Sequence, residues 1–239
     1  MLLKLLKKEW ALCLHPTSWI MLGLCTLILI PNYPYGVSFF YMTLAIFFLS
    51  MNARENHDVT FTLTLPVAKR DLVTGRFLLC MLLELLSLLA AGLMILLHRA
   101  LISAPNAAGL DANLALLGEG LILYGVFHLL FFPAHYRDVS RIGVPFLTAS
   151  AAVFLLIVLE IVLCHALPLF RDVLDTPDPQ HRGAKLLFLL LGAVFYALAT
   201  WLALRLSQRR FQMLDIRGLS LDKARSLCFN CFITIQRTG

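Results

Sequence analysis

Long apolar runs alternate with short polar segments along most of the chain. Runs of this kind are typical of membrane-spanning helices, which need about 20 predominantly apolar residues to cross the hydrocarbon core. The pattern predicts six spans, which lie at residues 17–30, 36–51, 72–97, 114–132, 143–167 and 184–206. We therefore expect an all-α integral membrane protein.

The first two runs are shorter than a straight crossing requires. An uncharged turn joins them at residues 31–35, and its two prolines, Pro31 and Pro34, cannot continue a helix. Two arrangements stay open for this pair. The runs are either two short spans or a helical hairpin that crosses only part of the bilayer and returns to the side it entered.

Composition supports the same class. Hydrophobic residues make up 60% of the 239 positions, charged residues make up 14%, and the mean hydropathy is +0.83. Soluble domains contain only about 45–50% apolar residues. The formal net charge is +6. Because cytoplasmic loops of membrane proteins are rich in Lys and Arg, we assign this excess to segments that flank the spans, and we expect no nucleic-acid partner.

The distribution of Lys and Arg predicts the orientation. If the N-terminus lies inside, sixteen of the twenty basic residues fall on the inner side, and four fall outside: Arg99, Arg171, Arg182 and Lys185. Such a bias is a strong orientation signal. Both termini are therefore predicted to be cytoplasmic.

Residues 1–15 have two different faces at helical spacing. Lys4, Lys7 and Lys8 share one face, whereas Trp10 and several leucines occupy the other. A helix of this type lies in the headgroup region instead of crossing the bilayer. The pattern predicts an amphipathic elbow helix, anchored at the interface by these four residues and separated from the first span by Pro16. The alternative is a simple cytoplasmic extension of that span.

Residues 52–71, here called the coupling segment, are the most polar part of the first half of the chain. The alternation of apolar residues with threonine over residues 59–65 is typical of a strand, but no partner strand is predicted. Asp71 is expected in the first turn of the third span, where the helix dipole favours an anion. Since the other loops are short, we predict that this segment contacts a cytoplasmic motor. The contact residues would be Arg54, Glu55, Asn56, Asp58, Phe61, Leu63, Leu65 and Pro66.

Motifs for catalysis and metal binding are missing from the sequence. There is no phosphate-binding glycine loop, H-E-x-x-H or G-x-S-x-G. Cys228 and Cys231 form a lone Cys-x-x-Cys pair, and a structural zinc ion needs four ligands. We therefore predict no metal site, no cofactor and no catalytic residue on this chain.

Three carboxylates fall within predicted spans: Glu84, Glu119 and Glu160. Ionisable groups in the bilayer are costly and commonly functional. Glu119 and Glu160 are expected at similar depth near the outer boundary, where they would line the exit of a substrate pathway or bridge helices. An alternative class is an intramembrane protease or lipid-modifying enzyme built on the three carboxylates and His128. A third class is a passive immunity or regulatory protein.

The run Arg-Glu-Asn-His-Asp-x-x-Phe-Thr-Leu-x-Leu-Pro-Val-x-Lys-Arg-Asp at residues 54–71 resembles the permease subunits of bacterial ATP-binding-cassette exporters of the type-2 class. More narrowly, the chain looks like the group that includes the phenol-soluble-modulin exporter permeases and related peptide or drug exporters. The resemblance covers residues 1–218, whereas the tail at 219–239 has no counterpart. Ala68 stands where a helix-capping Ser would fit better.

The resemblance implies a six-span permease domain at residues 16–218 in the bacterial cytoplasmic membrane. A coupling helix at 55–65 would dock on a separate ATPase subunit, which would bind the ATP and Mg. Two permease chains, identical or homologous, and two ATPase subunits would form the transporter. The expected function is export of amphipathic peptides, lipids or drugs, with no catalysis by this chain itself.

Overall fold

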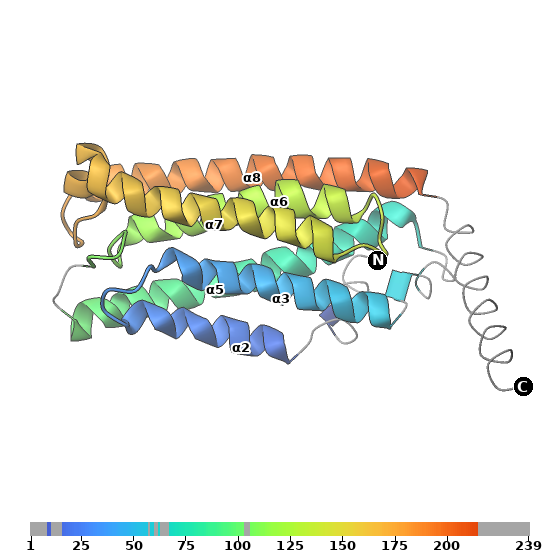
Figure 1. The fold of residues 1–239 in the computed structure, drawn as a ribbon, viewed down its shortest axis with the longest axis horizontal. Coiled ribbons are helices and arrows are strands. Elements are labelled where there is room, and N and C mark those ends of the chain that lie inside the picture. The colour runs from blue at the N-terminus through green and yellow to red at the C-terminus, as the bar shows by residue number, and fades with distance from the viewer. Residues whose placement is uncertain are drawn as a thin grey trace, which may run out of the picture.

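The computed structural model describes residues 9–10, 16–56, 58–59, 62, 67–102 and 106–214. Within these ranges every regular element is helical and the helices run side by side along the long axis (Figure 1). The elements are α2 (Thr17–Gly23), η1 (Leu24–Leu29), α3 (Gly36–Glu55), α5 (Lys69–Leu101), α6 (Leu114–His135), α7 (Gly143–Ala166), η2 (Phe170–Leu174) and α8 (Arg182–Met213).

Five of these helices, α3, α5, α6, α7 and α8, are long and apolar enough to cross a membrane. They coincide with the second to sixth predicted spans. The first predicted span is a seven-residue α-helix followed by six residues of 3-10 helix. Together these measure about 22 Å, which is shorter than the hydrocarbon core of about 30 Å. The second run, in contrast, is the 20-residue α3, about 30 Å long, so only the first of the two runs is shorter than a straight crossing.

The third and sixth predicted spans were too short. α5 has 33 residues and α8 has 32, so each measures about 50 Å. The apolar runs mark only the part of each helix that suits a bilayer. The backbone hydrogen bonds continue beyond it, through residues such as Lys69 and Arg210, because nothing in the sequence breaks the helix there.

Glycines set the close approach of α6 and α8. A Cβ on Gly192 of α8 would lie 2.6 Å from the backbone oxygen of Gly118 on α6, and a Cβ on Gly125 would lie 2.9 Å from the Phe195 ring. Small residues allow membrane helices to pack backbone against backbone. The two helices therefore form the tightest pair around which the bundle is arranged.

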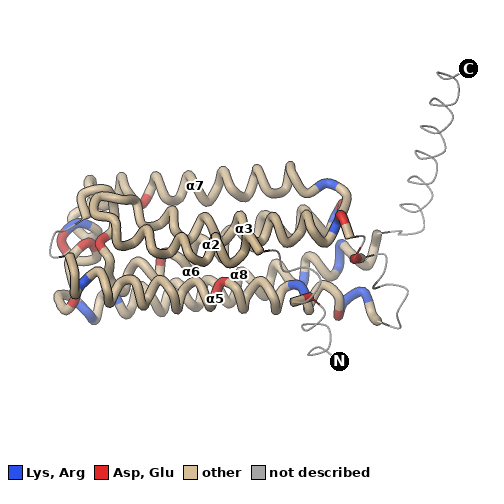
Figure 2. The backbone as a smooth tube through the Cα atoms, turned by 90° about the horizontal axis from the view of Figure 1, so that it is seen from below, with Lys and Arg blue, Asp and Glu red and all other residues tan. Residues whose placement is uncertain are grey.

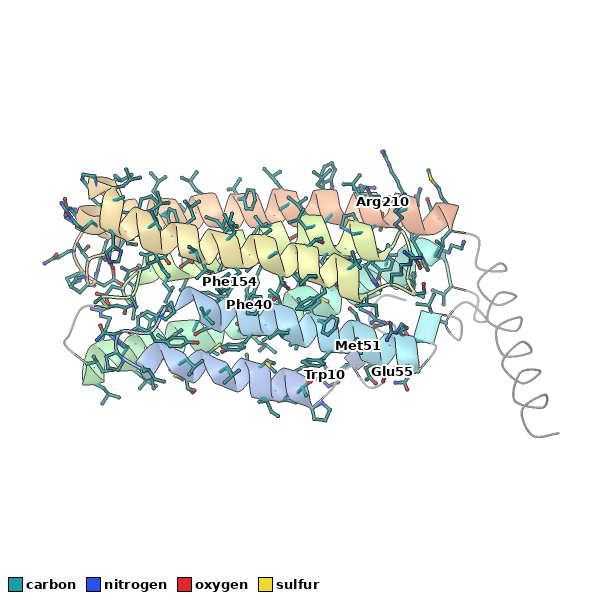
Figure 3. The ribbon with its side chains drawn as sticks, viewed as in Figure 1. Trp10, Phe40, Met51, Glu55, Phe154 and Arg210 are labelled. Carbon is teal, nitrogen blue, oxygen red and sulfur yellow. The ribbon has the colours of Figure 1, made fainter. Side chains whose placement is uncertain are left out.

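Charged residues gather at the two ends of the bundle (Figure 2). One end, here called the basic end, contains the end of α3, the start of α5 and the end of α8; Glu55 and Arg210 both lie there (Figure 3). The Lys69 ammonium donates a hydrogen bond to the Leu214 carbonyl at 2.9 Å. The other end, here called the loop end, contains the connections at 30–35, 106–113 and 167–181.

Ala68 occupies the N-cap of α5 with extended backbone angles and without a capping side chain. We expect Ala68→Ser to stabilise the protein by about 1 kcal/mol, because a serine hydroxyl at this position accepts an orphan backbone N–H of the first turn. Thermal unfolding of the purified protein in detergent measures the change. Ala68→Val, which cannot cap, provides the control, and a gain with valine equal to that with serine would contradict the capping explanation.

Candidate functional site

A buried ionic cluster at the basic end connects three parts of the chain. Arg76 of α5 lies at its centre. Its Nε atom is 2.6 Å from a Glu9 carboxylate oxygen, and its Nη2 atom is 2.9 Å from a carboxylate oxygen of Asp58. All three side chains are buried. We call these three residues the Arg76 cluster.

The three members of the cluster come from three segments that are far apart in the sequence. Glu9 comes from the N-terminal segment that was predicted to be an elbow, Asp58 from the coupling segment, and Arg76 from the second turn of α5. The Thr62 hydroxyl donates to the second Asp58 oxygen at 3.4 Å. A buried charge is tolerated when it is paired and hydrogen-bonded. Displacing one of the three segments would therefore leave charge buried without compensation.

The other predicted coupling residues are distributed around this cluster. Asp58, Val59 and Thr62 have helical backbone, and Arg54, Glu55 and Asn56 are exposed at the end of α3. The Arg54 guanidinium donates to the Ser140 carbonyl at 3.2 Å, which ties α3 to the loop between α6 and α7. The remaining predicted contacts lie outside the described residues; they are Phe61, Leu63, Leu65 and Pro66.

The predicted interfacial anchor is described only at Trp10. Its ring packs edge-to-face on Trp19 of α2, with ring centroids 5.9 Å apart, and both rings are partly exposed. Tryptophan is favoured at membrane–water interfaces because its ring is apolar and its N–H is polar. Lys4, Lys7 and Lys8 lie outside the described residues.

A small cavity of about 20 Å³ adjoins the Arg76 cluster. Its lining includes Arg54, Val59, Arg76 and His135, so it touches α3, the coupling segment, α5 and α6. A cavity of this size holds about one water molecule when polar partners are present. It cannot hold a nucleotide or a substrate.

A second polar network lies in the middle of the bundle. Glu84 of α5 receives a hydrogen bond from the Tyr196 hydroxyl at 2.6 Å and lies 2.8 Å from Nε2 of His128. The other ring nitrogen of His128 is 2.9 Å from the Thr200 hydroxyl. Three helices, α5, α6 and α8, are therefore joined through their side chains at mid-membrane depth. We call these four residues the core clamp.

The order hydroxyl, imidazole, carboxylate in the core clamp is also the order in nucleophilic hydrolases. Thr200 is buried, however, and lines neither the small cavity beside Arg76 nor the groove between α5, α6 and α8. The four residues of the intramembrane-enzyme alternative do not form one site either. Glu84 and His128 belong to the core clamp, whereas Glu119 and Glu160 lie near the loop end.

Glu160 of α7 binds the connection at 106–113. Its carboxylate accepts a hydrogen bond from the Leu110 backbone at 2.6 Å and one from the Cys164 thiol at 3.3 Å. Glu119 packs against the first turn of α3, where one carboxylate oxygen lies 2.7 Å from the Cβ position of Gly36. Both Glu119 oxygens are buried without a hydrogen-bond partner among the described residues.

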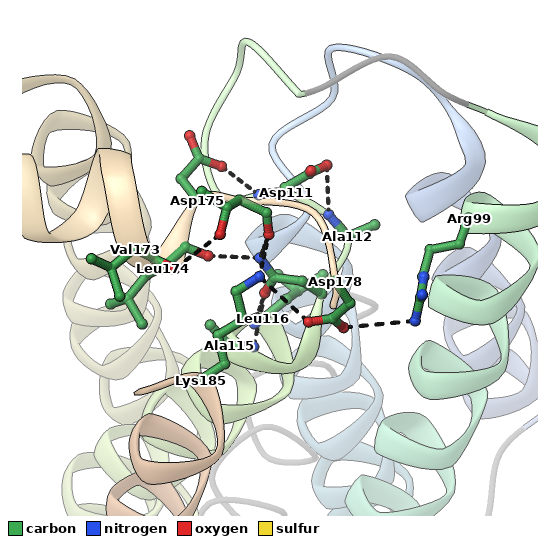
Figure 4. A network of polar contacts seen from close by, with 12 residues as sticks. Arg99, Asp111, Ala112, Ala115, Leu116, Val173, Leu174, Asp175, Asp178 and Lys185 are labelled. Atoms are coloured by element: carbon green, nitrogen blue, oxygen red, sulfur yellow. Dashed lines mark hydrogen bonds and ion pairs between the residues drawn. The ribbon is translucent and has the colours of Figure 1, made fainter. Parts of the chain in front are cut away.

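The loop end is closed by further polar contacts (Figure 4). The Asp111 backbone donates to Asp175 at 2.8 Å, and the Asn113 side chain donates to the carbonyls of Leu174 and Thr176. Burial raises the pKa of Asp175 to about 7, and the carboxylates of Asp111 and Glu160 act in the same direction. The connection at 106–113 is therefore fastened to the one that precedes α8.

The described residues contain no group of His, Cys, Asp or Glu that could hold a metal ion. The Cys228 and Cys231 pair lies outside them, so the prediction for that pair stays untested. The sequence interpretation missed Arg76, Glu9, Tyr196 and Thr200. For Arg76, an available signal was its position inside a helix two turns after a cluster of charges.

The fold defines the class of the protein: a multi-pass α-helical membrane protein, whose described residues form five membrane-length helices and one shorter apolar helix. The family follows from comparison with known proteins. Residues 3–212 match the family described as ABC-2 family transporter protein. Because this match covers most of the chain, the chain belongs to that family of non-catalytic transporter membrane subunits. No match was found among curated proteins or among solved structures.

Proposed function

We propose that this permease subunit exports amphipathic molecules, and that the Arg76 cluster transmits the work of a separate ATPase to the membrane domain. Membership of the ABC-2 family supports the transport role and the partnership with ATPase subunits. The observation that carries the coupling role is the ion-paired contact of Arg76 with both Glu9 and Asp58.

Coupling between the ATPase and the membrane domain depends on free energy. ATP binding on a partner can shift a membrane domain only through contacts that differ between its two states. A soluble partner can reach the coupling segment at the basic end through exposed Arg54, Glu55 and Asn56. The buried Asp58 then passes any displacement to α5, because leaving its charge unpaired costs about 3–5 kcal/mol.

The remaining parts of the proposal follow from the family resemblance and the charge distribution. Two permease chains and two ATPase subunits would form the working complex in a bacterial cytoplasmic membrane, with the basic end on the ATPase side. The substrate class would resemble that of the phenol-soluble-modulin exporters. Glu119 and Glu160 would border the exit at the loop end; Glu119 is the stronger candidate for substrate contact because its oxygens have no described partner.

The coupling proposal is tested by co-purification and ATP hydrolysis. Affinity-tagged chain extracted from its own membrane in mild detergent should carry an ATPase subunit and hydrolyse ATP. We expect Arg76→Gln to lower the hydrolysis that co-purifies with the chain at least fivefold, because the charge that holds Asp58 and Glu9 is removed. Size-exclusion chromatography of the same preparation checks that the variant stays folded.

Arg141→Gln is the matched control. Arg141 lies at the same end and is ion-paired with Asp138 at 3.2 Å, but its side chain is exposed. This variant should retain full activity, and Arg76→Lys should retain part of it. Equal hydrolysis in wild type and a folded Arg76→Gln variant would refute the coupling role. Absence of any ATPase from all preparations would refute the proposed function.

A further inference from the structure

A large groove opens on the side of the bundle near the loop end. Its volume is about 670 Å³, within the range of about 300–1,000 Å³ that is typical of ligand sites. The walls come from three helices. They consist of Leu88, Leu89, Gly92, Leu93, Ile95 and Leu96 of α5, Leu114 and Leu117 of α6, and Leu186 of α8.

Among the described residues, three that line the groove are charged, and all three lie at its rim: Arg99, Asp178 and Arg182. Asp178 lies 4.0 Å from Arg99 and 3.4 Å from the buried Lys185 (Figure 4). Two cations, Arg99 and Lys185, therefore flank this carboxylate, and a third, Arg182, is exposed with no ion pair among the described residues. The rim has a net positive charge.

The groove is apolar along most of its length and charged at one end, as a lipid has an apolar chain and a polar headgroup. Leu88 precedes Arg99 by eleven residues on the same helix, so the apolar slot extends about 16 Å from the charged rim toward the middle of the bundle. Leu89, Leu93 and Leu96 are exposed on a helix long enough to span the membrane, so the slot opens toward the hydrocarbon. Arg99 and Arg182 lie near helix ends, at the level of headgroups.

We infer that this groove binds an anionic phospholipid, with an acyl chain along the leucines and the headgroup phosphate at Arg99 and Arg182. The net positive charge of the rim favours an anionic headgroup over a zwitterionic one. Each arginine near the membrane surface attracts an anionic lipid, and the one carboxylate at the rim is already offset by Lys185 and Arg99. The inference does not depend on the proposed transport function.

Gly92 explains why the slot is open. A Cβ at Gly92 would find Leu117 at 3.9 Å, an ordinary contact, so the floor of the groove has room that a larger side chain would occupy. Gly92→Phe should therefore fill the slot without displacing the backbone.

The experiment compares two lipids with identical acyl chains, phosphatidylglycerol and phosphatidylcholine, added to the purified chain in detergent. Melting temperature against lipid concentration gives the affinity, since a ligand that binds only the folded state stabilises it. We expect wild type to bind phosphatidylglycerol more tightly. Arg99→Gln and Arg182→Gln should each weaken that binding about fivefold, the equivalent of about 1 kcal/mol. They should weaken phosphatidylcholine binding less, because choline offsets the charge of its phosphate. Arg182→Lys should keep the preference.

Arg171→Gln is the control for general surface charge, because Arg171 is exposed at the same end but does not line the groove. It should bind both lipids as wild type does, and Gly92→Phe should bind neither. Equal binding of the two lipids by wild type would overturn the inference, and so would an undiminished preference in Arg99→Gln and Arg182→Gln. If Gly92→Phe changed the mass measured by light scattering but not lipid binding, the groove would be an interface between chains.

Discussion

Gly192→Ala should destabilise the bundle by about 2 kcal/mol, within the range for overpacked cores, and Gly192→Leu should prevent the close packing of α6 and α8. The added Cβ would lie 2.6 Å from the backbone oxygen of Gly118. A flexible side chain can move aside, but a backbone carbonyl within a helix cannot, so the two helices must separate. Thermal melting in detergent, followed by size-exclusion chromatography, measures the loss.

Gly183→Ala is the control on the same helix. A Cβ there meets nothing within 4 Å, so only the helix propensity changes. Because Gly183 lies in the first turn of α8, alanine is favoured over glycine by less than the roughly 1 kcal/mol that applies in a helix interior. The two substitutions should therefore have opposite signs. If Gly192→Ala melted at or above the temperature of the wild type, the close approach of α6 and α8 would not be a determinant of stability.

His128→Leu and Glu84→Leu should each cost about 3 kcal/mol, because removing one partner of a buried pair leaves the other without compensation. Glu84 lies 2.8 Å from His128, and both side chains are at most 1% exposed. Replacing the two together with leucine removes both polar groups and fills the space. The double variant should therefore lose much less stability than the sum of the two single variants.

Thr200→Val provides a graded comparison. It keeps the shape of the side chain and removes one hydrogen bond to His128, which is worth about 0.6 kcal/mol between membrane helices. Melting temperatures of the four variants and the wild type complete the test. Additive losses in the double variant would show that Glu84 and His128 do not act as a unit.

Hydrophobic pattern was enough to locate the membrane helices, because a span needs only a sufficient apolar length. Predicted boundaries for 143–167 differ by one residue from α7, whereas the predicted ends of α5 and α8 fell short by two to seven residues. Helix ends depend on caps and neighbours. Asp71 was correctly predicted in the first turn of α5.

Partners in the interior could not be predicted in the same way. The sequence drew attention to Glu84 and His128 as costly intramembrane groups, but Tyr196 is 112 positions from Glu84 and looks like an ordinary aromatic residue in an apolar run. Asp58 was recognised as a charged residue that faces a motor, whereas the structure places it against Arg76 inside the bundle. Pairing of this kind depends on how helices cross, and a local sequence pattern does not determine that.

The uninterrupted helix α5 contributes Arg76 to the Arg76 cluster, Glu84 to the core clamp and Arg99 to the rim of the groove. Arg76 lies eight residues before Glu84, about 12 Å along the axis, and Arg99 lies fifteen residues after it, about 22 Å along the axis. If α5 tilts about the core clamp, its two ends lie at unequal distances from the pivot point. A displacement of 1 Å at the basic end would then move the groove rim by about 2 Å in the opposite direction, by rigid-helix geometry alone.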